Sequence, residues 1–252
     1  MALDVSYSLA LNEQFAMSVT SRYFRSDLGQ FELGNSRNTI NSVSFDIGAH
    51  YQGEFINSFR FRHGAVLSNL GPKVKYNDQQ HPYFIPIQLK LGSSLEFNMG
   101  DENVILAALE FGKLLVPTPL EDQINSSLIQ GIFQSFSDAP GGGREELNEI
   151  SYSLGMEYQF KSKFSLRTGY FRQSPTKGYQ NFFSLGTGFQ NDFFKMDLSF
   201  LINVSSFQNQ LRNTFRISLS FPIQIQTKEE DEPQEENSEI ESEAVEITAL
   251  QK

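Results

Sequence analysis

The residue types that most often carry chemistry are scattered in this sequence and form no motif. Its three histidines, His50, His63 and His81, stand on separate stretches without the spacing that a metal site requires. The paired acids at 121–122 and 145–146 could act as acid and base, but adjacent acids in a loop are more often solvated surface. The glycines at 141–143 precede no Lys-Ser or Lys-Thr, and no serine stands in a nucleophile elbow. The sequence therefore indicates no enzyme, no metal and no cofactor.

The charge of the chain is unevenly distributed. The net charge is −10, but ten acidic residues and two lysines between positions 228 and 252 account for −8 of it. The body is therefore nearly neutral, without the basic patch that nucleic-acid binding requires. We predict that residues 228–252 form an acidic disordered tail. Such a tail can be a partner-binding arm, although it is more often a solvated extension.

Alternation of apolar and polar residues dominates the body, residues 1–227. This period of two predicts β-strands. Eleven stretches show it, at 3–11, 15–23, 43–51, 59–67, 85–97, 104–111, 150–160, 164–170, 183–189, 194–202 and 215–223. Turns of a few residues join many of them, which favours antiparallel pairing. The predicted fold class is therefore all-β and antiparallel.

Strand length, loop length and the two faces favour a transmembrane β-barrel. Strands of about nine to eleven residues suit a tilted bilayer crossing. Short turns alternate with long loops, as in outer-membrane barrels, where the turns are periplasmic and the loops extracellular. One face is apolar, whereas the other carries charges such as Asp4, Arg22, Glu157 and Arg167. A soluble barrel would have to bury these charges, so we expect the polar face to line the lumen.

The strand count leads to an expectation about the N-terminus. Such a barrel has an even number of strands and both ends in the periplasm. Eleven strands that end in the periplasm would leave Met1 outside, and no signal peptide precedes the first strand. We therefore expect the chain to lack an odd number of strands at its N-terminus.

The loop at 112–147 is the one long interruption of the strand pattern. It contains Pro117 and Pro119, a short segment that could be helical, and a Pro-Gly-Gly-Gly break at 140–143. The alternation of turns and loops places it on the extracellular side. Long loops on a rigid scaffold often carry function, so this loop is the predicted binding element.

Several motifs of this sequence are long enough to indicate a family. In the loop these are KLLVPTP at 113–119, GIFQSFSDAPGG at 131–142 and EEL at 145–147, and elsewhere NLGPK at 69–73 and RTGYF at 167–171. Together they resemble the PorV family of outer-membrane proteins from the type IX secretion system. The resemblance covers most of residues 2–224. It implies a FadL-like barrel of fourteen strands, which would be the eleven found here and three more.

The resemblance also implies a shuttle rather than an enzyme. A PorV-like protein would receive secreted cargo from the translocon and deliver it, by the C-terminal signal domain of the cargo, to the attachment complex at the cell surface. Its partners would be outer-membrane lipid, cargo, translocon and attachment-complex proteins. We expect the contact residues to be Phe133, Phe136, Ser137, Asp138, Pro140 and Gly141. The two phenylalanines could instead pack the loop onto the barrel rim.

Two other functions are compatible with a barrel. A FadL-like channel for hydrophobic small molecules would need an apolar pocket in the lumen, and the charged inner face argues against it. A plain structural barrel or porin would conduct ions. Conductance recording would separate a porin from a shuttle.

Overall fold

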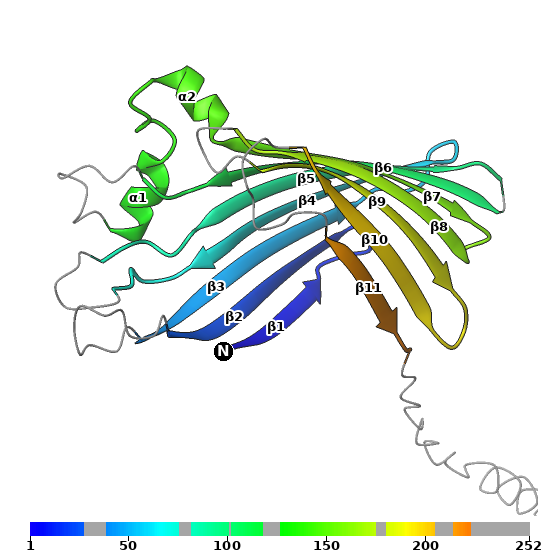
Figure 1. The fold of residues 1–252 in the computed structure, drawn as a ribbon, viewed down its shortest axis with the longest axis horizontal. Coiled ribbons are helices and arrows are strands. Elements are labelled where there is room, and N and C mark those ends of the chain that lie inside the picture. Colours follow the sequence, from blue (N-terminus) through cyan, green and yellow to red (C-terminus); the bar gives the residue numbers. More distant parts are fainter. Residues whose placement is uncertain are drawn as a thin grey trace, which may run out of the picture. The chain divides into compact units, whose positions relative to one another are not determined.

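The computed structural model describes residues 1–27, 39–75, 82–100, 102–117, 127–174, 180–204 and 214–222. Within these ranges, eleven strands form one antiparallel sheet in which each strand pairs with its neighbours in sequence (Figure 1). The strands are β1 (Ala2–Ala10), β2 (Phe15–Asp27), β3 (Thr39–Gln52), β4 (Phe59–Leu70), β5 (Gln88–Asn98), β6 (Asn103–Leu114), β7 (Ile150–Phe160), β8 (Phe164–Arg172), β9 (Asn181–Gln190), β10 (Lys195–Asn203) and β11 (Phe215–Ser220). Two helices, α1 (Leu128–Gln134) and α2 (Gly143–Asn148), lie between β6 and β7. The prediction of an all-β antiparallel fold with eleven strands is confirmed.

The register of the strands gives the sheet two faces of different character. Leu154 of β7 lies opposite Leu109 on one side and Tyr170 on the other, which continues an apolar row across three strands. Glu157 of the same strand lies opposite Arg167, on the other face. Because side chains alternate along a strand, this pairing separates an apolar face from a polar face.

The apolar face is more accessible to solvent than the polar face. In β2, Met17, Val19 and Tyr23 are exposed, whereas Ser18 and Arg22 between them are half-buried. The same inversion occurs in β7 and β9. A soluble sheet would bury its apolar side chains, since burial is the main driving force of folding. The inversion is the pattern of a sheet whose apolar face meets lipid.

Charges on the polar face are arranged as compensating pairs. Arg60 donates to Glu96 at 2.9 Å, and Arg62 shares the same carboxylate. Further along the sheet, Arg167 bridges Glu157 and Asp197. Partly buried charges are tolerated only when they are paired in this way.

A third cluster on the polar face joins three strands. Arg22 of β2 donates to Asp4 of β1 at 2.9 Å and approaches Asp46 of β3 at 3.5 Å. Its other terminal nitrogen donates to Asn69 Oδ1 at 3.0 Å. This cluster connects the strands of the sheet to the point where β4 ends.

Asn69 and Gly71 form the corner at which the chain leaves β4. Asn69 has a φ of 61°, and its side-chain amide donates to the carbonyl of Pro86 at 3.0 Å. A Cβ on Gly71 would lie 2.5 Å from the Val43 carbonyl oxygen and 2.8 Å from Cδ1 of Ile85. The corner therefore requires a glycine, and it draws the segment before β5 against β3.

The prediction that the fifth strand begins at Ile85 is wrong, because β5 begins at Gln88. Ile85 and Ile87 are buried instead, and Pro86 between them has no N–H to give to a strand ladder. The Ile87 carbonyl accepts a hydrogen bond from Leu115 at 2.8 Å, which joins this segment to the end of β6. Among the described residues, the buried aliphatic side chains are Ile40, Ile85, Ile87, Leu115 and Ala139. All five lie in or beside long connections, so the packed core is at the loop end of the sheet.

Among the described residues, β1 pairs only with β2 and β11 only with β10, so the sheet is not closed into a barrel. The expectation of further N-terminal strands stays a prediction. The chain divides into two compact units, Met1–Ser220 and Phe221–Lys252. The predicted tail at 228–252 lies outside the described residues, as do His81 and the acids at 121–122.

Candidate functional site

The described part of the connection between β6 and β7 contains two short helices at the loop end of the sheet (Figure 1). Ser127 caps α1, and its hydroxyl accepts a hydrogen bond from the Gln130 amide at 3.3 Å. Gly142 precedes α2 with a φ of 68°, a conformation that favours glycine. The predicted helical segment is thus confirmed as α1. The predicted loop start at Gly112 is three residues early, since β6 continues to Leu114.

One side of α1 is packed against the protein. Gly131 is buried so closely on the ring of Phe84 that a Cβ would lie 2.6 Å from its Cζ atom. Ser135, one helical turn later, is also buried, and its hydroxyl donates to the Ile132 carbonyl at 2.8 Å. Residues four apart share a helix face, so Gly131 and Ser135 mark the face that α1 buries.

The other side of α1 carries an exposed apolar stripe. Ile129, Phe133 and Phe136 are 66%, 72% and 49% exposed. Ile129 and Phe133, four residues apart, share one face of α1, and Phe136 lies in the turn directly after the helix. Phe133 is therefore free of the packing that would hold the loop onto the sheet, whereas Phe136 is partly covered.

A buried lysine lies below this loop. Lys113 Nζ, at the end of β6, lies 2.8 Å from Glu146 Oε2 and 2.6 Å from Glu149 Oε2. The three side chains are 10%, 15% and 14% exposed. The ammonium also lies 5.7 Å from the ring centroid of Phe136, within the range of a cation–π contact. We call Lys113, Glu146 and Glu149 the lysine triad.

The lysine triad also orders the turn between the helices. Glu146 Oε1 accepts a hydrogen bond from the Ala139 amide at 2.9 Å, so one carboxylate contacts both the turn and the lysine. Partial burial raises the pKa of Glu146, but the hydrogen bonds from Lys113 and Ala139 outweigh it and hold the pKa below its ordinary value. Glu146 is thus ionised at neutral pH.

The other predicted contact residues lie in this turn. Ser137 and Pro140 are exposed, and Asp138 is half-buried. Gly141 is exposed, and its amide donates to Glu145 Oε2 at 2.7 Å. The structure therefore brings all six predicted residues together on α1 and the turn that follows it. No partner is present, so their role in binding stays a prediction.

The sequence pattern does not predict the lysine triad. The expectation that the acids at 145–146 are solvated surface is wrong for Glu146, which is partly buried and paired with Lys113. The three-residue spacing of Glu146 and Glu149 on one side of α2 was an available signal, because such residues share a helix face. The pairing of Lys113 with these glutamates could not be predicted from the sequence. It depends on how the loop returns the chain to Ile150, which lies opposite Lys113 in the sheet.

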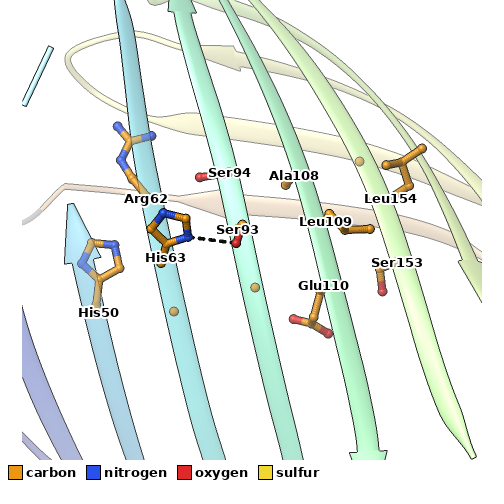
Figure 2. A pocket seen from close by; sticks show the side chains of 13 residues that line it. His50, Arg62, His63, Ser93, Ser94, Ala108, Leu109, Glu110, Ser153 and Leu154 are labelled. Carbon is orange, nitrogen blue, oxygen red and sulfur yellow. Dashed lines mark hydrogen bonds between the residues drawn. The ribbon is translucent and has the colours of Figure 1, made fainter. Parts of the chain in front are cut away.

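A second candidate site is a hollow of about 420 Å³ over β3 to β7 (Figure 2). Gly64, Gly92 and Gly155 belong to its floor, and a Cβ on any of them would meet only a backbone oxygen at 3.8–3.9 Å. Polar side chains around it include His50, Arg62, Ser94, Glu110 and Ser153. The hollow thus combines an apolar floor with polar and charged side chains, including Arg62 and Glu110.

The histidines of this region lie on opposite faces of the sheet. His63 is on the apolar face, where its Nδ1 atom is 2.9 Å from Ser93 Oγ (Figure 2). Its ring also stacks on that of Tyr51. His50 belongs to the polar face, opposite Gly64. In the part of the chain that the structure describes, no group of three or more His, Cys, Asp or Glu could hold a metal ion.

No helix in the described ranges is long and apolar enough to cross a membrane. No curated protein matches the chain. The family model described as type IX secretion system protein PorV matches residues 1–121. The match includes the corner at Asn69 and Gly71, the polar-face clusters of β1 to β5 and Lys113, and it ends before α1. Over residues 1–121, just under half of its 252 residues, the chain is similar to the PorV family of type IX secretion proteins.

Proposed function

We propose that the chain is an outer-membrane shuttle that binds secreted cargo, delivered by the translocon, and carries it to the cell-surface attachment complex. The exposed apolar face supports the membrane location. In water, so large an apolar surface would promote aggregation, whereas lipid satisfies it. The similarity of residues 1–121 to a type IX secretion family supports the pathway.

The observation that carries the binding role is the exposed stripe of Ile129, Phe133 and Phe136. Apolar side chains spaced in this way on a helix are suited to an apolar groove on a partner. The buried side of α1 leaves Ile129 and Phe133 exposed, whereas Phe136 is half-exposed and also contacts the lysine triad. We therefore assign the C-terminal signal domain of the cargo, or a translocon protein, to this stripe.

The polar face supports binding rather than conduction or catalysis. Its arginines Arg22, Arg62 and Arg167 are all engaged with carboxylates, which leaves little net field to attract an ion. The hollow of Figure 2 is lined with His50, Arg62 and Glu110, which disfavours the FadL-like alternative of a hydrophobic ligand. We infer that the protein is not an enzyme.

Replacing Phe133 and Phe136 with serine tests the binding role. We expect retention of a purified cargo signal domain to fall at least about tenfold, because buried aromatic anchors dominate interfaces. Phe193, an equally exposed phenylalanine in the short turn between β9 and β10, provides the matched control. Serine at Phe193 should leave retention unchanged. Full retention by the Phe133 and Phe136 variant, with normal membrane assembly, would refute the role.

A conductance measurement tests the porin alternative. Planar bilayers containing the full chain should show no steady ion current, since compensated charges line the polar face. A stable conductance that substitutions on the polar face alter would favour a pore over a shuttle.

A further inference from the structure

Lys113 is the point where the loop and the sheet are joined. It belongs to the last pair of β6 with β7, opposite Ile150, which directly follows the loop. Its side chain is nearly buried, although lysine is among the residues least often buried. The ammonium of such a lysine must be paired with carboxylates, because an unpaired buried ammonium is strongly unfavourable.

Three structural parts meet at the Lys113 ammonium. Glu146 in α2 and Glu149 at its C-terminal cap pair with the ammonium. The other carboxylate oxygen of Glu146 accepts a hydrogen bond from the Ala139 amide in the turn. The Phe136 ring contacts the ammonium from the turn directly after α1. Without the lysine, two carboxylates would remain close together and partly buried. Like charges at this separation repel, and their hydration is restricted. Removing the lysine would therefore destabilise the whole connection from α1 to α2.

We propose that Lys113 is a positioning residue that holds α2, the turn and Phe136 in place before any partner arrives. The stripe on α1 is then a preformed surface, and binding need not order the loop. Preorganisation of this kind increases affinity because less conformational entropy is lost on binding. The effect on cargo rests on the proposed function, whereas the effect on the loop does not.

The test is amide hydrogen exchange on the full chain in lipid vesicles. In Lys113→Met, amides of residues 128–148 should exchange at least about tenfold faster, because local opening becomes easier. Lys113→Arg keeps the charge and should restore most of the protection. Lys161→Met removes the exposed pair of Lys161 with Glu102 at the opposite end of the sheet and should change nothing in the loop.

A second variant tests the proposal independently in case Lys113→Met misfolds. Glu149→Gln keeps the lysine and the Ala139 hydrogen bond but removes one carboxylate, so it should accelerate exchange in α2 by a smaller factor. Unchanged exchange in both Lys113→Met and Glu149→Gln would overturn the proposal. So would faster exchange that Lys113→Arg fails to reduce.

Cargo retention, measured on the same samples, separates the two proposals. Faster exchange together with weaker retention supports both. Faster exchange with unchanged retention supports the positioning role and refutes the stripe as the binding surface. Weaker retention with unchanged exchange overturns the positioning role, because Lys113 would then act on the partner directly.

Discussion

Arginine in place of Leu154 is the sharpest test of which face meets the membrane. Leu154 is 54% exposed on the apolar face of β7, a strand of 11 residues. At about 3.3 Å per residue this strand is roughly 36 Å long. A tilt of about 45° reduces its height to about 25 Å, the thickness of the apolar band of such barrels. Leu154 is the fifth of the eleven residues and lies close to the middle of that band.

An arginine near the middle of the bilayer costs about 2–4 kcal/mol in barrels of this kind. In a soluble sheet, the same change at an exposed position would stay within about 0.5 kcal/mol. The two environments therefore predict different results for one substitution. Arginine at Ser153, the neighbouring residue on the polar face, is the matched control and should cost less than about 1 kcal/mol.

Urea titration of the protein folded into lipid vesicles measures this difference, with the folded fraction read from gel mobility of unheated samples. The midpoint for Leu154→Arg should fall clearly below those of the parent and of Ser153→Arg. An unchanged midpoint for Leu154→Arg, or a larger loss for Ser153→Arg, would refute the assignment of the faces.

Two further predictions concern the loop end of the sheet. Gly71→Ala should destabilise the protein by about 1–3 kcal/mol in urea titration, because its Cβ would meet the Val43 carbonyl oxygen at 2.5 Å. Gly64→Ala, whose Cβ has space, should be neutral within about 0.5 kcal/mol. The depressed pKa of Glu146 predicts that its stabilising contribution is complete above the pKa of an unfolded glutamate. That contribution should be lost as the pH falls through the lower folded pKa; a ¹³C titration of the Glu146 carboxyl that Lys113→Met does not shift upward would contradict this.

The strands could be predicted from sequence because the period of two is a local property of the chain. The stretch 150–160 alternates without exception, and β7 has the predicted bounds. Alternation does not reveal whether a residue belongs to a ladder, and Ile85 and Ile87 alternate as strand residues do. The nearby Pro86 was the available signal, because a proline has no N–H for a central strand. The corner at Asn69 directs the chain so that Ile85 and Ile87 lie outside β5. It does so through contacts with β2 and β3, which are distant in sequence.

The candidate site was predictable in part for a similar reason. Phe133 and Phe136 could be selected from a loop that departs from the strand pattern. Whether they are exposed depends on the face that α1 buries, which Gly131 and Phe84 determine across more than forty residues of sequence. The role of Lys113 depends on the return of the chain to Ile150. Such long-range contacts have no periodic signature.

The distribution of packing in this protein restricts where specific recognition can occur. The apolar face is suited to lipid, which offers little specificity, and the charges of the polar face are largely compensated. The buried side chains are concentrated at the loop end, where Ile87 and Leu115 join two long connections. The packed residues at the loop end therefore support α1, which carries the exposed apolar stripe. Protein partners are expected there, because a rigid support lets exposed side chains bind without first being ordered.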